Sequence, residues 1–201
     1  MSRYTGPKWK LTRREGFELD EGKNILERRP NAPGEQGRRR RKLLGYGLQL
    51  REKQKVKRIY GIHERQFRLF FKRAERQKGV TGENLLRMLE QRLDNTVFRL
   101  GFAMTRRQAR QLVTHCHVLK NGKKATIPSM IVEVGDVISI KEKSRSNVQI
   151  SDSLKRVSGR GVPEWLDLKK EEFSGKVLRQ PYRKDVTVPI SEQLIVELYS
   201  K

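Results

Sequence analysis

The stretch between residues 92 and 143 constrains the fold more than any other part of the chain, because helix and turn signals follow one another there at fixed spacing. Asp94 and Gly101 bound a short helix, since Asp accepts hydrogen bonds from free N–H groups and Gly tolerates the left-handed conformation. Thr105 and Gln108 stand three residues apart and predict a capping box for a second helix, from 106 to about 115.

A small antiparallel sheet is predicted to follow these helices. Asn121-Gly122 is a strong hairpin signal, because a type I′ turn needs a positive φ at both central residues. Val134-Gly135-Asp136 then turns the chain into a strand at Val137–Lys141. The apolar residues at helical spacing that are predicted to face the core are Val97, Phe98, Leu100, Ala109, Leu112 and Val113.

The polar side of this stretch carries charge of one sign. Between residues 92 and 124 there are eight cations and a single acid, Asp94; the cations are Arg92, Arg99, Arg106, Arg107, Arg110, Lys120, Lys123 and Lys124. Two of them, Arg106 and Arg107, occupy the first turn of a helix, where the macrodipole disfavours cations. This placement indicates an anionic partner that also binds the helix N-terminus. The alternative is a solvated face that only keeps the protein in solution.

These helices, this hairpin and these cations together resemble the RNA-binding domain first described in the fourth small-subunit ribosomal protein. The same domain occurs in tyrosyl-tRNA synthetases, pseudouridine synthases and a heat-shock ribosome-binding protein. The rest of the chain decides between these families.

Charge and composition point to a polyanionic partner and a reducing environment. The 201 residues carry a formal charge of +23, and because residues 164–201 hold seven acids and seven bases, the whole excess lies in residues 1–163. Cys116 is the single cysteine, so an internal disulfide and a thiolate metal cluster are excluded. No signal peptide or transmembrane run is evident, so we expect a cytoplasmic protein that does not bind membranes.

Residues 1–42 are predicted to form a basic extension rather than a domain, because proline and glycine are frequent and large apolar residues are few. Its last five residues are all cations, and such a block stays open until counter-charge arrives. We expect an arm that follows RNA phosphates; a disordered tail or a localisation signal is the alternative.

Residues 46–93 are predicted to form three helices, ended in turn by Gly61, by Gly79 and near Leu93. Phe67, Phe70 and Phe71 belong to the core rather than to a base-stacking platform. The first helix is dense in cations and is predicted to form a second RNA face. Its cations are Arg51, Lys53, Lys55, Lys57 and Arg58.

The segment after the RNA-binding stretch is predicted to contain a short helix at 152–157 and two extended segments, one after Pro163 and one at 175–180. Trp165 is a predicted packing anchor. Residues 190–199 are predicted to form a helix with an apolar stripe. We expect this helix to fold back on the helices of residues 46–93, because its apolar face and theirs both need a partner.

Several motifs extend the resemblance to nearly the whole chain: SRYTGPKWKLTRREG, YGLQLREKQKVKRIYG, ERQFR, GENLL, RLDN and LIVELYSK. In this order they resemble the bacterial-type family of the fourth small-subunit ribosomal protein. The resemblance implies an α+β fold with a basic extended N-terminal arm (1–42) and a mostly helical domain closed by the C-terminal helix (43–91 with 178–201). A second domain (92–177) contains the inserted RNA-binding module (92–153), with two helices and a small antiparallel β-sheet. Some relatives carry zinc-binding cysteines in the arm, and this chain has none there.

The resemblance implies a structural protein of the small ribosomal subunit, bacterial rather than plastid, that binds the 5′ domain of 16S ribosomal RNA and nucleates assembly of the subunit body. It also implies a part in translational accuracy with small-subunit proteins five and twelve, and contact with protein five. No cofactor, metal or homo-oligomer is expected. The arm is expected near messenger RNA at the entry path, through Arg39, Arg40 and Lys42.

The candidate RNA-binding residues combine the arm, the first helix and the module. They are Arg38, Arg39, Arg40, Arg41, Lys42, Tyr46, Arg51, Lys53, Lys55, Lys57, Arg58, Arg92, Arg99, Arg106, Arg107, Arg110, Lys120, Lys123 and Lys124.

Other functions fit less well. Arg92-Leu93-Asp94 resembles the motif around the catalytic aspartate of pseudouridine synthases, but the chain after the module is too short for that catalytic domain. His115, Cys116 and His117 diverge on a helix, so they do not form a metal site, and we expect no enzyme. A stand-alone protein that binds tRNA or other structured RNA and a DNA-binding protein remain as alternatives.

Overall fold

A computed structural model of the chain describes residues 4–19, 24–38 and 44–200. The chain forms two compact units, residues 1–82 with 189–201 and residues 83–188. No helix in the part that the structure describes is both long enough and apolar enough to cross a membrane.

The unit of residues 83–188 is built on a five-stranded antiparallel sheet. Its strands are β1 (Val118–Lys120), β2 (Lys123–Lys124), β3 (Val137–Ile140), β4 (Leu166–Lys169) and β5 (Ser174–Val177). Their order is β2-β1-β3-β5-β4, so the two late strands extend the sheet beside β3. Paired residues such as Val118 with Ile140 and Leu166 with Val177 are buried, which gives the sheet one apolar face.

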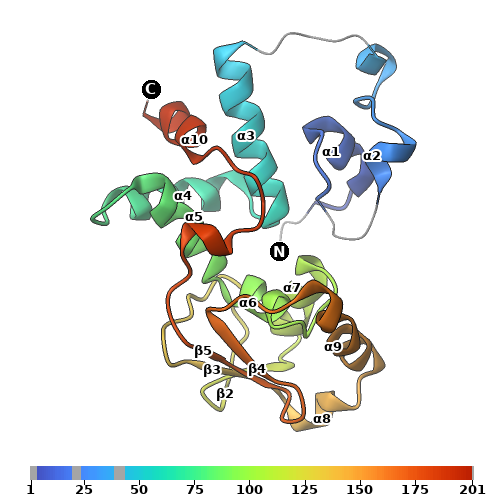
Figure 1. Cartoon of the computed structure of the whole chain (residues 1–201), viewed down its shortest axis with the longest axis vertical. Coiled ribbons are helices and arrows are strands. Elements are labelled where there is room, and N and C mark those ends of the chain that lie inside the picture. The colour runs from blue at the N-terminus through green and yellow to red at the C-terminus, as the bar shows by residue number, and fades with distance from the viewer. Residues whose placement is uncertain (1–3, 20–23, 39–43, 201) are drawn as a thin grey trace. The chain divides into compact units, whose positions relative to one another are not determined.

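Helices cover that apolar face (Figure 1). The helices of this unit are α5 (Thr81–Glu90, which begins in the other unit), α6 (Leu93–Arg99), α7 (Arg106–Thr114), α8 (Glu142–Arg145), α9 (Val148–Arg160) and the 3-10 helix η2 (Arg183–Asp185). Trp165, the predicted packing anchor, is fully buried with Phe102 and Ile138 in one core. The predicted α+β fold is confirmed, with more helix than expected, since the helix predicted at 152–157 extends over 148–160.

The ends of α6 and α7 confirm one predicted signal and revise two. Gly101 has φ 84, and its N–H donates to the Phe98 carbonyl (3.0 Å) while the Phe102 N–H donates to the Val97 carbonyl (3.2 Å), which closes the helix as a Schellman motif. Asp94 is not the N-cap, because Arg92 holds that position. The capping box predicted at the start of α7, from Thr105 and Gln108, is only half formed.

In that half-formed box, the Thr105 hydroxyl accepts from the Gln108 N–H (3.2 Å). The Gln108 side chain does not return to the cap residue itself; it accepts from the N–H of Met104 at 2.9 Å. The predicted Asn121-Gly122 turn is confirmed, with φ of 51 and 76.

Replacing Gly101 with alanine is expected to destabilise this unit by about 2–4 kcal/mol. A Cβ at this position meets the Val157 side chain, and the left-handed conformation by itself costs an L-residue about 1–2 kcal/mol. Gly135 is the matched control, since it has φ 91 and a Cβ added there meets nothing within 4 Å. Urea unfolding should show the larger loss for Gly101→Ala; equal losses would contradict the packing argument.

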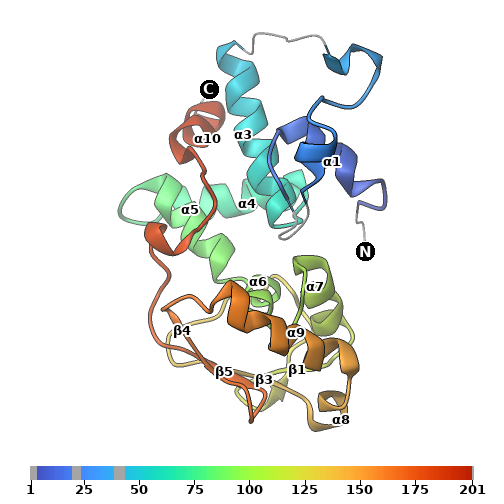
Figure 2. The same ribbon diagram turned by 45° about the vertical axis from the view of Figure 1, so that its right-hand side comes forward.

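The other unit is helical. Its elements are α1 (Lys8–Glu15), α2 (Ile25–Arg28), the 3-10 helix η1 (Glu35–Arg38), α3 (Gly45–Ile59), α4 (Glu64–Glu75) and α10 (Glu192–Tyr199). Helix α10 lies beside α3 (Figure 2). The centroid of the Tyr199 ring lies 4.6 Å from that of Phe71, in a tilted arrangement, and 6.0 Å from that of Phe67, in a stacked one. The predicted return of the C-terminal helix is therefore confirmed. The described part of the arm is not simply extended, because it holds three short helices.

Candidate nucleic-acid interface

Two of the predicted RNA-binding arginines lie in the protein interior. The Arg92 side chain is fully buried, and its Nε and Nη2 donate to Asp94 at 3.0 and 2.6 Å. The Arg99 side chain forms the same forked pair with buried Glu90, at 3.0 and 2.8 Å. A buried, paired guanidinium has no surface to offer RNA. We therefore remove Arg92 and Arg99 from the candidate interface: Arg92 fixes the start of α6 through Asp94, and Arg99 ties α6 to Glu90 at the end of α5.

Arg106 joins this buried network from its edge. Its Nε donates to the Asn95 side-chain oxygen (2.8 Å), and Asn95 in turn donates to Glu90 (2.8 Å). The Arg106 and Arg160 guanidinium groups both lie over the Phe98 ring, at 4.4 and 4.2 Å from its centroid. Arg106 is thus half-buried and fixed in position, so it orients the start of α7 more than it extends toward a partner.

The exposed cations of the module lie at the start of α7 and at the β1–β2 turn. Arg107 is exposed and Arg110 is half-exposed, with its Nη1 at 3.9 Å from Asp94. Lys123 and Lys124 are exposed beside the turn, as predicted. Of the predicted residues in the module, Arg107, Lys123 and Lys124 are the fully exposed ones, so an RNA phosphate can reach these three most readily.

Lys120 supports the turn from inside. Its ammonium pairs with Asp136 at 2.8 Å and donates to the Ile131 carbonyl at 3.2 Å. Burial alone would raise the pKa of Asp136, but bonds from the Glu133 N–H, Lys120 and Asn121 outweigh it and hold that pKa below its usual value. The ionised Asp136 therefore ties Lys120 and the turn residue Asn121 to the start of β3.

The cations of α3, predicted as a second RNA face, are bound inside the unit. Arg51 and Arg58 both contact Glu15 of α1, which is completely covered, and the Arg51 bond is 3.1 Å. Lys53 and Lys57 pair with Glu64 of α4, at 2.7 and 3.0 Å.

The last cation of α3, Lys55, pairs with Glu52 and donates to the Pro189 carbonyl. All five side chains are no more than 30% exposed. Their role in the structure is to hold α1, α4 and the C-terminal segment against α3.

Glu64 is the centre of the contact with the C-terminal helix. Burial alone would raise its pKa, but bonds from Lys53, from the Tyr199 hydroxyl (2.7 Å) and from Lys57 outweigh it and lower the pKa to about 2. Burial and the bond to Glu64 raise the pKa of Tyr199. An ionised Glu64 thus anchors α10 through a neutral tyrosine.

Because the folded-state pKa of Glu64 lies below its usual value of 4.5, its contribution to stability is present above pH 4.5 and is lost as pH falls toward 2. The carboxylate is 41% exposed, so solvent screening limits the contribution to about 1 kcal/mol. We expect Glu64→Gln to be less stable than the wild type in urea at pH 6, with the gap narrowing below pH 4.5 and closing near pH 2, where the folded-state carboxylate becomes protonated. A gap of the same size at pH 6 and at pH 2 would show that the carboxylate charge is not responsible.

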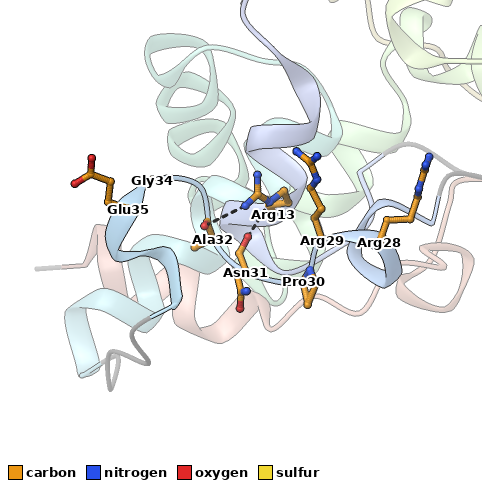
Figure 3. Close-up of a pocket in the computed structure, with 8 residues that line it drawn as sticks. All are labelled: Arg13, Arg28, Arg29, Pro30, Asn31, Ala32, Gly34 and Glu35. Carbon is orange, nitrogen blue, oxygen red and sulfur yellow. Dashed lines mark hydrogen bonds between the residues drawn. The ribbon is translucent and has the colours of Figure 1, made fainter.

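The described part of the arm adds cations that the sequence pattern did not single out. Arg28 and Arg29 are exposed at the rim of an open hollow of about 610 Å³ (Figure 3). Arg13 lies in the same hollow but donates to the Asn31 and Ala32 carbonyls at 2.8 and 3.3 Å, so it holds the loop in shape. Tyr46 is 62% exposed at the start of α3.

Several predicted residues lie outside the part of the chain that the structure describes. These are Arg39, Arg40, Arg41 and Lys42, and for Arg38 only the backbone is described. Among the described residues, no group of three His, Cys, Asp or Glu side chains is arranged to hold a metal ion.

Comparison with known proteins gives full-length similarity. Residues 3–90 match the ribosomal protein S4/S9 N-terminal domain, and residues 91–138 match the S4 domain. Small ribosomal subunit protein uS4 of Citrifermentans bemidjiense and that of Geobacter sp. (strain M21) are each 56% identical, and uS4 of Thermoanaerobacter pseudethanolicus is 55% identical. Each comparison covers 100% of this chain and 100% of the relative.

Proposed function

The chain belongs to the family of small ribosomal subunit protein uS4, and from this membership we propose that it is built into the small subunit of a bacterial ribosome through direct contact with ribosomal RNA. It is an rRNA-binding ribosomal protein and not an enzyme. The observation that carries the proposal is the match of residues 91–138 to the S4 domain, within which Arg107, Lys123 and Lys124 remain exposed.

Within this function we propose the 5′ domain of 16S rRNA as the RNA target, bound early so that the body of the subunit assembles around it. Protein five is the proposed neighbour, and a contribution to translational accuracy with proteins five and twelve is proposed on the same grounds. The proposed location is the cytoplasm, where bacterial ribosomes work. These statements derive from the family resemblance and from the basic charge of residues 1–163.

We propose three functional regions. Residues 1–42 form the basic arm, with Arg39, Arg40 and Lys42 near messenger RNA; residues 43–91 with 178–201 form the helical domain; and residues 92–177 form the second domain with its module at 92–153. The five consecutive cations at 38–42 support the first assignment, because such a run binds most strongly to closely spaced phosphates.

Binding should combine charge neutralisation with recognition of shape. Each phosphate contact releases counterions, so the affinity falls with salt by a log–log slope of about 0.7–0.9 per contact. Selectivity should come from the form of a folded RNA junction, because the deep A-form major groove hides the base edges.

A salt titration with three competitors tests the proposal: the 5′ domain of small-subunit rRNA, bulk tRNA and duplex DNA. We expect tight rRNA binding to persist at salt concentrations that abolish binding of the other two. Equal affinities that fall together would indicate a generic polycation and would refute the proposed target. Equal binding of rRNA and tRNA, with weak DNA binding, would favour the stand-alone structured-RNA-binding protein.

A further inference from the structure

The outer face of α4 carries a row of cations. Arg65, Arg68, Lys72, Arg73 and Arg76 are all exposed, and their spacing of three and four residues places them on one side of the helix. With a rise of 1.5 Å per residue, the row is about 16 Å long. The opposite side of α4, which includes Phe67, Phe70 and Phe71, is buried.

These cations differ from those of α3 in their surroundings. Every cation of α3 contacts a carboxylate. In the part of the chain that the structure describes (residues 4–19, 24–38 and 44–200), the side chains of the five α4 cations form no ion pair and no hydrogen bond. Glu64, the acid at the start of α4, points to Lys53 and Lys57 instead. Glu75, at the other end, is exposed and, among the described residues, takes part in no ion pair with this row.

A structural role explains only part of this arrangement: Lys72 and Arg73 stand in the last turn, where the macrodipole favours cations. Like charges at i,i+3 and i,i+4 nevertheless repel one another and weaken a helix, and Arg65 stands in the first turn, where the macrodipole disfavours a cation. An external polyanion removes both penalties. The row therefore has the character of a binding surface.

We infer that this row binds the phosphate backbone of double-helical RNA within the ribosomal RNA target, an inference that rests on the proposed function. Double-helical RNA is chosen over single-stranded RNA because of the side chains that the outer face of α4 exposes. Recognition of single strands uses aromatic side chains on which bases stack, and the aromatic rings of α4 are all buried, so that Leu69 is the sole large apolar side chain exposed on this helix. A rigid row of cations without stacking groups fits a regular line of phosphates.

The test compares two variants of the full chain with equal change in charge. Arg65→Gln/Lys72→Gln/Arg76→Gln removes three cations from the row, and glutamine is a good helix former, so the fold should persist. Lys155→Gln/Lys169→Gln/Lys184→Gln is the control: its three lysines are 61–80% exposed, and each lies near a carboxylate. Binding to the rRNA 5′ domain, to an RNA hairpin duplex and to oligouridine is measured at several salt concentrations, after circular dichroism confirms folding.

We expect the α4 variant to lose about 10- to 100-fold in affinity for the rRNA domain and for the duplex, with a salt slope smaller by about 2–3. The control should lose less than about threefold, and oligouridine binding should respond equally in both variants. Equal losses in the two variants would overturn the inference, as would a loss seen only with oligouridine. If rRNA binding is unchanged but the α4 variant no longer enters reconstituted subunits, the row binds protein and the inference is also overturned. Failure of the wild type to prefer rRNA would instead refute the proposed function.

Discussion

Replacing Arg107, Lys123 and Lys124 with glutamate is expected to weaken binding to the rRNA 5′ domain by roughly 100- to 1,000-fold at about 0.1 M salt, because three lost phosphate contacts reduce the salt slope by about 2–3. All three side chains are exposed on the S4 domain. Arg106 is left unchanged, because its bond to Asn95 and its contact with Phe98 are part of the packing. The measurement is filter binding across a salt series, with folding checked by near-ultraviolet circular dichroism.

The matched control carries the same change in charge at Lys155, Lys169 and Lys184. If affinity depends on net charge alone, both variants lose the same amount and the salt slopes shift together. If the S4 domain contacts RNA through the start of α7 and the β1–β2 turn, the control keeps most of the affinity. Unchanged binding in the folded triple variant would contradict the proposed interface.

Breaking the buried pair of Glu90 and Arg99 is expected to destabilise the protein more than the loss of Gly101 or of the Glu64 carboxylate. Arg99→Met leaves the Glu90 carboxylate, which is fully buried, without its forked partner. Removing one member of a buried ion pair costs about 3–5 kcal/mol, which for a chain of this size corresponds to a fall in Tm of roughly 6–20 °C. The pair lies within one compact unit, so the effect is expected on the unfolding of residues 83–188.

Trp165 provides a local probe for this experiment, because it is fully buried in the same unit. In a Trp9→Phe background, its fluorescence during urea unfolding follows residues 83–188 alone. The double variant Glu90→Leu/Arg99→Met should recover part of the loss, because it leaves no uncompensated charge. A double variant as unstable as Arg99→Met would contradict the electrostatic explanation and would indicate a packing defect.

The contrast between α3 and α4 shows where charge patterns are informative. Both helices are rich in Arg and Lys, and from the sequence α3 is the stronger candidate because it follows the basic run at 38–42. In the structure, the α3 cations meet Glu15 and Glu64, whereas the outer row of α4 meets no acid among the described residues. A signal was present in the sequence: the cations of α4 recur at three- and four-residue spacing opposite its phenylalanines.

Local signals determined much of the fold without tertiary information. The Asn121-Gly122 turn, the end of α6 at Gly101 and the apolar face of α4 were all predictable, because each depends on the backbone preferences or the periodicity of a few adjacent residues. Helix α9 was predicted too short, although Ile150, Leu154 and Val157 already show helical spacing, because polar residues surround them. The net charge of +23 likewise indicated a polyanionic partner, because the charge of a chain is known from its sequence alone.

Only the tertiary structure decided which cations are available to a partner. Arg58 meets Glu15 from 43 residues away, and Arg99 at the end of α6 meets Glu90 at the end of α5. No periodicity in the sequence encodes such pairs, because they form between segments that the fold brings together. Burial then separates arginines of the same module into two kinds: Arg92 and Arg99 stabilise its interior, and Arg107 remains on its surface. The physical reason is that a charge can leave water only beside an opposite charge, and the position of that charge is a property of the fold.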